Sequence, residues 1–293
     1  KKRKIEKIFR AKGIPYDLFV SESERDLRKM SIEVMHQYKD IIAVGGDTTF
    51  NIIASEILNH EIPAHPLPRL GIIGTGSAND VCRDLGIEKV ESLCDCLVGK
   101  KVRKMDVGLV EISGVQQRYY FLGSMSVGLG TVVNQYVDQF NRKYRGLTRF
   151  TPGGQVLVGG LGVFKAFARK QVPLTLTLFS DQNEEKISFS LLVFLNTRYY
   201  ANGLNLNEET SAFDGRIDCM VLHTASAWET WRFKQWLKQG LHRDQDGIRY
   251  FGSSRFDISM DTALDILLDG EIIRNVSQCQ VAVLPGALEV FVP

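Results

Sequence analysis

The sequence lacks any apolar run long enough to cross a membrane. Its most apolar long stretch, Val156–Phe164, is followed at once by Lys165 and falls far short of the roughly 18–20 residues that a membrane-spanning helix requires. The chain also lacks repeats and low-complexity segments, which excludes a fibrous or repeat architecture. Its net charge is only +2, so a basic surface over the whole protein, of the kind that binds nucleic acid, is excluded as well.

Cysteine is scarce and irregularly spaced. The five cysteines are an odd number and form no C-x-x-C pair, which argues against a structural zinc site and against a disulfide framework. We therefore expect reduced thiols in a cytoplasmic protein. The chain begins at Lys1 rather than at Met, so we expect further residues to precede it in the full protein.

What the chain does have is the length and the apolar material for two domains. Its 293 residues are about twice the usual single-domain length, and 44% of them are hydrophobic, enough to offset the ordering entropy. The first third predicts strands at Tyr16–Val20, Ile41–Val44 and Leu70–Ile73, and a glycine-rich loop and a helix follow each of the last two. Strand, loop and helix in alternation predict a parallel sheet with right-handed crossovers.

From about residue 102 onward the pattern changes to short β-branched or alternating runs separated by turns, which is typical of antiparallel strands. The predicted strands include Val102–Ile112, Phe256–Met260 and Ala263–Leu268. Helical stretches near 152–169 and 226–240 interrupt these runs. We therefore predict an α/β fold with two domains. The N-terminal parallel-sheet domain covers residues 1–105, with residues 286–293 returning to it, and the C-terminal antiparallel, β-sandwich-like domain covers residues 106–285.

The two glycine-rich loops, GGDTT at 45–49 and GTGSAND at 74–80, are the informative feature of the first domain. A glycine-rich turn lets the backbone approach an anion closely, and the N–H groups of the following helix point at it. Asp47 and Asp80 suit such a site if a cation bridges them to a phosphate, or if one of them accepts a proton. The alternative is that both loops are left-handed turns in which the aspartates act as caps.

Several further segments stand in a fixed order along the chain: GIIGTGSAND at 71–80, KMDVG at 104–108, FLGSMSVGLG at 121–130, DGRID at 214–218, DGE at 269–271 and LPGAL at 284–288. Together with GGDTT, this ordered set resembles the diacylglycerol kinase catalytic domain family. That family includes bacterial soluble lipid kinases, sphingosine kinases and ceramide kinase, and is distantly related to NAD kinases. The resemblance runs from about residue 16 to the last residue.

The resemblance implies a two-domain lipid kinase that uses ATP and Mg²⁺, with its active site between the domains. It would transfer the γ-phosphoryl group to the hydroxyl of diacylglycerol or a related lipid. Phosphoryl transfer depends mostly on positioning and charge neutralisation, which suits glycine loops and carboxylates. The β-rich domain would take its lipid substrate from a membrane surface, so we expect peripheral membrane association and no nucleic-acid partner. The resemblance is also compatible with a homodimer.

The resemblance also implies roles for individual residues. Glu271, with Asp106, would take the proton from the lipid hydroxyl, and Asp47 would be catalytic through the metal and phosphates. Metal binding would fall to Asp47 and to Asp218, the latter in the loop where bacterial members carry a structural Mg²⁺. The nucleotide-binding residues would be Gly45, Gly46, Asp47, Thr48, Thr49, Gly76, Ser77, Asn79 and Asp80.

The chain departs from the family pattern in its first loop, where Thr48 replaces the third glycine of G-G-D-G-T. If that position has a positive φ, a β-branched residue is strained there, and we expect Thr48→Gly to bind ATP more tightly. This departure supports one alternative, a degenerate family member that binds lipid or nucleotide without turnover. An NAD kinase-like enzyme, which would share G-G-D, is the other alternative.

Two surface features have more than one interpretation. Residues 1–12 are strongly basic and either attract anionic lipid head groups or form a helix with a solvated basic face, and we favour the solvated helix. All three tryptophans, Trp228, Trp231 and Trp236, lie in one short segment among Lys and Arg residues. That composition fits an interfacial helix and fits equally well a helix packed on the β-rich domain.

Overall fold

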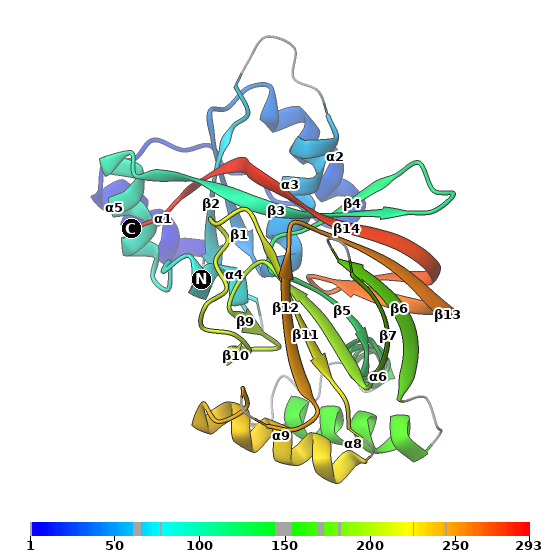
Figure 1. The fold of residues 1–293 in the computed structure, drawn as a ribbon. Helices are drawn as coiled ribbons and strands as arrows, with labels where there is room; N and C mark the ends of the chain where they lie inside the picture. The colour runs from blue at the N-terminus through cyan, green and yellow to red at the C-terminus, as the bar shows by residue number, and fades with distance from the viewer. Residues whose placement is uncertain are drawn as a thin grey trace.

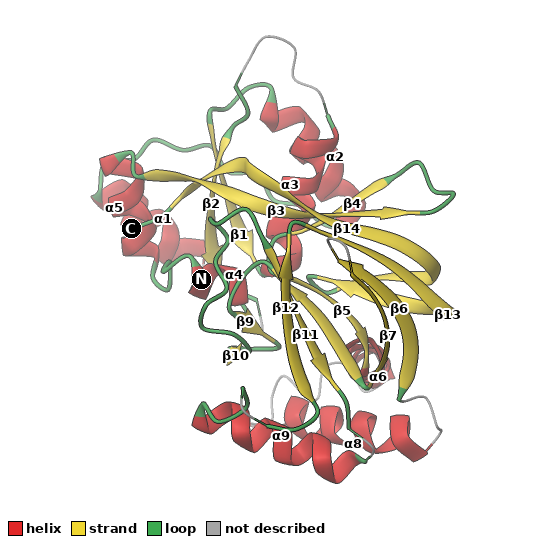
Figure 2. Ribbon diagram, in the orientation of Figure 1, coloured by secondary structure: helices red, strands yellow, loops and turns green. Residues whose placement is uncertain are grey.

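The structure is a computed structural model, and it describes residues 2–60, 66–76, 78–143, 154–168, 173–180, 183–224, 226–243 and 245–293. Figure 1 shows the course of the chain, and Figure 2 distinguishes its helices from its strands. None of the helices in these ranges is long and apolar enough to span a membrane.

The first domain is built on two parallel strands, β1 (Asp40–Gly45) and β2 (Arg69–Gly74). They pair in register, so that Gly45 lies opposite Gly74 and both strands end at the same level. The helices of this domain group around them (Figure 2): α1 (Lys2–Ala11), α2 (Glu24–Met35), α3 (Asp47–Asn59), α4 (Asp80–Asp84) and α5 (Val90–Gly99). The predicted strand–loop–helix alternation around residues 41–85 is thus present.

The predicted strand at Tyr16–Val20 is wrong. This segment is extended but pairs with no strand of the described chain, and its side chains pack edge-on against neighbouring aromatic rings instead. Tyr16 contacts Phe9 with ring centroids 5.6 Å apart, and Phe19 contacts Tyr38 at 5.7 Å. Strand propensity reports how well a side chain fits a pleated surface, and it does not supply the partner strand that pairing requires.

The second domain is antiparallel, as predicted, and its strands continue the same sheet, except for β9 and β10, which pair with each other alone. Strand order runs β1-β2-β14-β13-β5-β8-β11-β12. The strands are β3 (Val102–Ile112), β4 (Arg118–Phe121), β5 (Ser124–Gly128), β6 (Leu174–Ser180), β7 (Asn183–Phe189), β8 (Leu191–Leu195), β9 (Tyr199–Tyr200), β10 (Leu204–Asn205), β11 (Ile217–Leu222), β12 (Ile248–Ser253), β13 (Arg255–Leu268) and β14 (Glu271–Phe291). Helices α6 (Leu129–Lys143), α8 (Gly154–Ala168) and α9 (Ala227–Gln239) complete it.

The long strand β14 joins the two domains. Its first part pairs with β13, and it pairs with β3 on both sides of a register shift between Leu284 and Leu288. Near its end Val290 pairs in parallel with Leu70 of β2, so the strand finishes inside the first domain. The shift is the point at which the strand passes from one domain to the other, and it contains Gly286 at a φ of 58°, a conformation that favours glycine.

Apolar side chains fill three adjoining cores. One surrounds β1, β2 and the end of β14, and includes the fully buried Phe50. A second fills the inside of the β-rich domain around Phe194 and Phe256, whose rings meet at 5.2 Å. The third lies between the sheet and helices α8 and α9, where Phe233 and Leu237 are buried. Each domain therefore has its own apolar core, in line with the two-domain α/β prediction.

Candidate active site

The two glycine-rich loops meet backbone against backbone. The Gly45 carbonyl accepts hydrogen bonds from the N–H of Thr75 at 2.6 Å and of Gly76 at 3.3 Å. A Cβ built on Gly76 would lie 2.6 Å from the Cα of Gly46, closer than non-bonded carbon atoms approach. Thr49 packs its side chain against Gly45, where a Cβ would also have no room. Glycine is therefore required in both loops for the carboxyl ends of β1 and β2 to approach this closely.

Asp47 ties the first loop to the helix that follows the second. One of its carboxylate oxygens accepts the N–H of Asp80 at 2.8 Å, and the other accepts the N–H of Val81 at 3.1 Å. These are the free donors at the start of α4, so Asp47 acts as a cap supplied by another loop. Burial raises the pKa of the Asp47 carboxyl above its usual value, and the two N–H groups oppose that rise.

Asn79 and Asp80 organise the second loop. Asn79 has a φ of 56°, and its side chain accepts the N–H of Gly76 and donates to the Gly76 carbonyl, both at 2.9 Å. Asp80 is buried and accepts the N–H groups of Asn202 at 2.9 Å and Gly203 at 2.7 Å, in the turn between β9 and β10. Burial raises the pKa of Asp80. Asp80 therefore fastens the loop to the second domain, and Ser77, between these residues, lies outside the described ranges.

The D-G-E turn lies directly against the first glycine loop. Thr48 donates its hydroxyl hydrogen to the Asp269 carbonyl oxygen at 2.8 Å, although the two residues are 221 positions apart in the sequence. Gly270 has a φ of 97°, and a Cβ there would lie 2.6 Å from the Thr48 Oγ1. The turn and the loop consequently fit each other only with glycine at position 270.

The structure overturns the expected strain at Thr48. The residue lies in the first turn of α3 and is not one of the described non-glycine residues with positive φ. Its dihedral angles are those of an ordinary helical residue, so a β-branched side chain costs little there. In place of strain, the threonine hydroxyl provides a contact to the D-G-E turn that a glycine could not make.

Asp269 is a half-buried anchor that sequence reasoning missed. Its carboxylate accepts the N–H groups of Leu122 at 2.6 Å, Gly123 at 3.1 Å and Ser124 at 2.8 Å, between β4 and β5. Burial raises its pKa to about 7, against the effect of these donors. The D-G-E motif pointed to residues 269–271, but it does not show where each carboxylate lies. That depends on the left-handed φ of 43° at Asp269.

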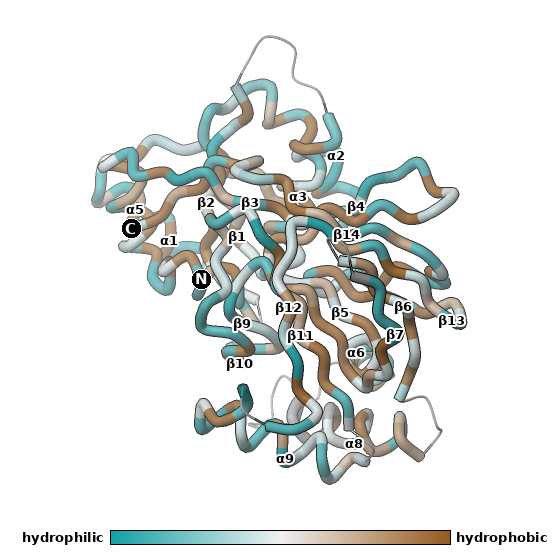
Figure 3. The backbone as a smooth tube through the Cα atoms, in the orientation of Figure 1, coloured by the Kyte–Doolittle hydropathy of each residue, from teal (hydrophilic) through white to brown (hydrophobic). Residues whose placement is uncertain are grey.

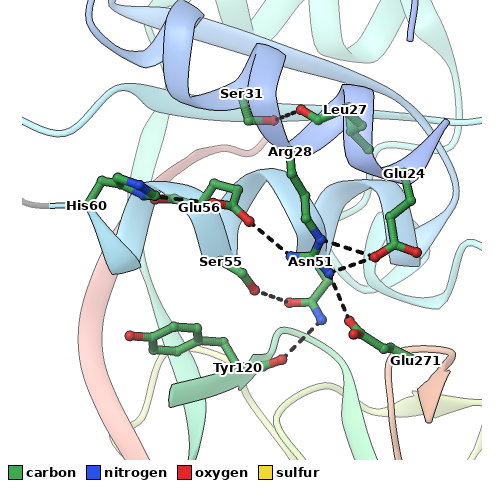
Figure 4. A network of polar contacts seen from close by, with 10 residues as sticks. All are labelled: Glu24, Leu27, Arg28, Ser31, Asn51, Ser55, Glu56, His60, Tyr120 and Glu271. Carbon is green, nitrogen blue, oxygen red and sulfur yellow. Dashed lines mark hydrogen bonds and ion pairs between the residues drawn. The ribbon is translucent and has the colours of Figure 1, made fainter. Parts of the chain in front are cut away.

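Glu271, the predicted proton acceptor, belongs to an ion-pair network centred on Arg28 (Figure 4). The Arg28 guanidinium contacts Glu24 at 2.8 Å, Glu56 at 2.9 Å and Glu271 at 3.3 Å. The Glu271 side chain is 37% exposed, whereas that of Glu56 is only 11% exposed. Sequence reasoning missed Arg28, because a basic residue on an amphipathic helix carries no signal for a partner 243 residues away.

The remaining predicted site residues lie elsewhere. Asp106 is buried, and its two oxygens accept the N–H groups of Gly215 and Gly286, each at 2.7 Å, so this geometry favours a structural role at the β14 register shift. Asp218 accepts hydrogen bonds from Thr210 Oγ1 at 2.6 Å and Asn207 Nδ2 at 3.1 Å. Among the described residues, no three His, Cys, Asp or Glu side chains gather as a metal site.

The fold and the paired loops agree with comparisons against known proteins. The diacylglycerol kinase catalytic domain family matches residues 1–110, and the YegS C-terminal NAD kinase beta sandwich-like domain family matches residues 123–292. The chain belongs to the diacylglycerol kinase family of lipid kinases, with a C-terminal domain of the YegS type.

Individual relatives support the same assignment. The chain is 24% identical to the "Probable lipid kinase YegS-like" of Stenotrophomonas maltophilia (strain K279a), over 97% of this chain and 89% of that protein. It is 25% identical to the diacylglycerol kinase of Bacillus subtilis (strain 168), over 81% of this chain and 72% of that protein. A solved structure of a diacylglycerol kinase from Bacillus anthracis str. Sterne has the same fold, with a TM-score of 0.69 at 18% identity over 98% of this chain and 88% of that one.

Proposed function

We propose that the protein is an ATP-dependent lipid kinase that transfers the γ-phosphoryl group to the hydroxyl of diacylglycerol or a closely related lipid. The observation that carries this proposal is the contact between Thr48 and the Asp269 carbonyl, which brings the D-G-E turn against the paired glycine loops. A phosphate bound at these loops would thereby lie near the half-exposed Glu271 carboxylate, as a phosphoryl transfer site requires.

The phosphates of ATP would bind at the start of α3. The N-cap residue of this 13-residue helix is Gly46, which has no side chain to satisfy the N–H groups of the first turn. These N–H groups and the helix dipole favour an anion at this position. The absence of Cβ atoms at Gly46 and Gly76 lets the two loops pack against each other beside this helix start. The start of α3 would therefore take the phosphates of the nucleotide.

The carboxylates near this position also fit a magnesium ion that arrives with the nucleotide. Mg²⁺ in kinases is held by phosphate oxygens and by only one or two protein carboxylates, so a cage of three acidic residues is not needed. Asp47, the first residue of α3, is the carboxylate that would hold the ion beside the phosphates. When bound, the ion would neutralise charge on the transferred phosphoryl group. Asp218 bonds to Asn207 and Thr210 and would take no part in it.

Glu271 would act on the acceptor lipid. Its carboxylate would accept the hydroxyl proton of the lipid while the hydroxyl oxygen forms a bond to the γ-phosphorus and the bond from that phosphorus to the β-phosphate oxygen breaks, leaving ADP. Arg28 would hold the Glu271 side chain in position without occupying both of its oxygens. The alternative of a degenerate member lost its main support once Thr48 proved to have ordinary dihedral angles.

A lipid phosphorylation assay tests the proposal. The purified chain would be incubated with radiolabelled ATP, MgCl₂ and a panel of lipid alcohols in mixed micelles, and the products separated by thin-layer chromatography. We expect ATP-dependent labelling of diacylglycerol or a similar lipid. Glu271→Gln should lower the turnover 10²–10⁴-fold, the usual contribution of a positioned base. Glu24→Gln, which removes another Arg28 contact, is the matched control and should retain most activity. A folded protein that labels none of the lipids would refute the proposal.

A further inference from the structure

Helices α8 and α9 present an apolar and basic surface away from the glycine loops. They pack against each other at one end of the molecule, at the bottom of Figure 1, beyond the sheet of the second domain. Each buries one stripe of side chains in the core beneath it, such as Phe233 and Leu237 of α9. Figure 3 shows hydrophobic and hydrophilic residues interleaved along α9.

The outer side of α9 carries two exposed tryptophans. Trp228 is 63% exposed and Trp231 50% exposed, and their rings stack with centroids 4.7 Å apart and an interplanar angle of 18°. Large exposed aromatics that cluster on one helix mark an interaction surface more often than a scattered exposed residue does. Tryptophan in particular has an apolar body and a polar N–H, and it is enriched where hydrocarbon meets water.

The neighbouring exposed residues extend this surface. On α8, Leu161 is 46% exposed and Phe164 is 63% exposed, and Leu241, just after α9, is 53% exposed. Together with Trp228 and Trp231, these three residues form what we call the α8–α9 patch. The patch thus combines three aromatic residues with two leucines on and beside adjacent helices, rather than a single protruding side chain.

The charges around the patch are predominantly positive. The two helices contain four basic residues, Lys165, Arg232, Lys234 and Lys238, against a single acidic residue, Glu229. Arg232 lies over the ring of Trp236, with 4.9 Å between its guanidinium carbon and the ring centroid. Basic side chains beside exposed tryptophans are the composition of helices that lie in the interface of an anionic bilayer.

We propose that the α8–α9 patch docks the protein on the surface of an anionic phospholipid bilayer. The inference rests on the proposed function in one respect, since a kinase for a water-insoluble lipid must take its substrate from a membrane. The occupant is a bilayer because the patch joins tryptophans to a surplus of positive charge, which complements anionic head groups. A second copy of the same chain would bring the four basic residues of each patch together, and like charges oppose such a dimer.

Tryptophan fluorescence tests this directly, because all three tryptophans of the chain lie in α9. The protein would be titrated with vesicles of phosphatidylcholine and phosphatidylglycerol at 3:1, with and without brominated phosphatidylcholine. We expect a blue shift of the emission and quenching by the brominated lipid. Binding should weaken at least tenfold when NaCl rises from 50 to 500 mM. It should weaken by at least as much when the vesicles contain phosphatidylcholine alone instead of the 3:1 mixture. Emission unchanged by these vesicles would overturn the proposal.

Variants separate docking from catalysis. In vesicle sedimentation, Trp228→Ser combined with Trp231→Ser should weaken binding at least tenfold, whereas Val98→Ser, at an exposed apolar position on α5, should leave it unchanged. Circular dichroism would show that the double variant is folded. Its activity on diacylglycerol in vesicles should fall about tenfold, with less than a twofold change on a dispersed short-chain diacylglycerol. Equal losses on both substrates, or light scattering that shows the variant has turned a dimer into a monomer, would overturn docking.

The same measurements keep the two proposals apart. Vesicle binding requires no phosphoryl transfer, so a protein that binds anionic vesicles through α9 but labels no lipid would support docking and refute the kinase proposal. A protein that phosphorylates the dispersed substrate but binds no vesicles would refute docking alone.

Discussion

The hydroxyl of Thr48 offers the sharpest test of how the two domains cooperate. We predict that Thr48→Val, which keeps the shape and removes the hydroxyl, lowers both the stability and the turnover. The lost hydrogen bond to the Asp269 carbonyl measures 2.8 Å, and one such bond contributes about 1 kcal/mol net. Because the bond joins the first domain to the D-G-E turn, the same loss should leave Glu271 less well positioned.

The magnitudes follow from that single contact. If about 1 kcal/mol of positioning is lost in the transition state, the turnover should fall about fivefold, with little change in the affinity for ATP. Thr48→Ser keeps the hydroxyl and should stay close to the parent protein. Thr48→Gly loses the hydroxyl and also some helix propensity, so it should be destabilised by about 1.5 kcal/mol. It should bind ATP no more tightly than the parent, contrary to the strain hypothesis.

Urea unfolding, ATP·Mg²⁺ titration calorimetry and lipid turnover on the four proteins give the necessary numbers. We expect the parent and Thr48→Ser to exceed Thr48→Val in both stability and turnover. Thr48→Gly should have the lowest stability of the four. If Thr48→Ser loses as much as Thr48→Val, the hydroxyl contact contributes nothing and the reasoning is refuted. Tighter ATP binding by Thr48→Gly would instead restore the strain hypothesis.

Three other substitutions test the remaining parts of the site. Asp47→Asn should abolish turnover, because the charge that would hold the metal ion is lost. It should also lower the stability of the fold by about 1 kcal/mol in thermal melts, because an amide can accept only one of the two N–H groups that the carboxylate accepts. Gly76→Ala should abolish ATP binding in calorimetry and cost about 1–3 kcal/mol of stability, since its Cβ would meet Gly46; unchanged binding would contradict the loop geometry. Asp269 has a folded-state pKa of about 7 against 3.8 ordinarily, so it stabilises the fold below about pH 4 and loses that contribution as the pH rises through 7. The stability of the parent relative to Asp269→Asn should therefore fall between pH 4.5 and 7.5 in urea titrations, on the order of 3 kcal/mol at most, and a flat difference would contradict the raised pKa.

Much of the fold was predictable from local patterns. The predicted strand at Val102–Ile112 coincides with β3, and the predicted helix at 226–240 with α9, because periodicity and turn residues act over a few positions. The failure at Tyr16–Val20 has the opposite cause, since pairing depends on a partner that no local pattern specifies. The same limit explains why two predicted strands near 256–268 are one strand, β13, with register shifts inside it.

The candidate site was predictable as segments but not as contacts. The GGDTT, GTGSAND and DGE segments were identifiable from residue type and order, since glycine and carboxylate chemistry is visible in the sequence. Which side chain faces which is decided by contacts across long sequence separations, such as that of Thr48 with Asp269. Arg28 illustrates the consequence: its role depends on α2 lying against α3, which no periodicity reveals.

The carboxylates of these motifs divide into two groups by what their oxygens contact. Each motif aspartate of the site, namely Asp47, Asp80, Asp106 and Asp269, accepts at least two backbone N–H groups. These contacts fasten loops to neighbouring segments of the chain, and those of Asp80 join the two domains. A buried carboxylate is stable only where such donors compensate its desolvation. Glu271 instead is bonded to a side chain, Arg28, and stays half-exposed. A proton acceptor must have an oxygen available to the substrate, and in this site that requirement selects the glutamate, while the aspartates build the geometry around it.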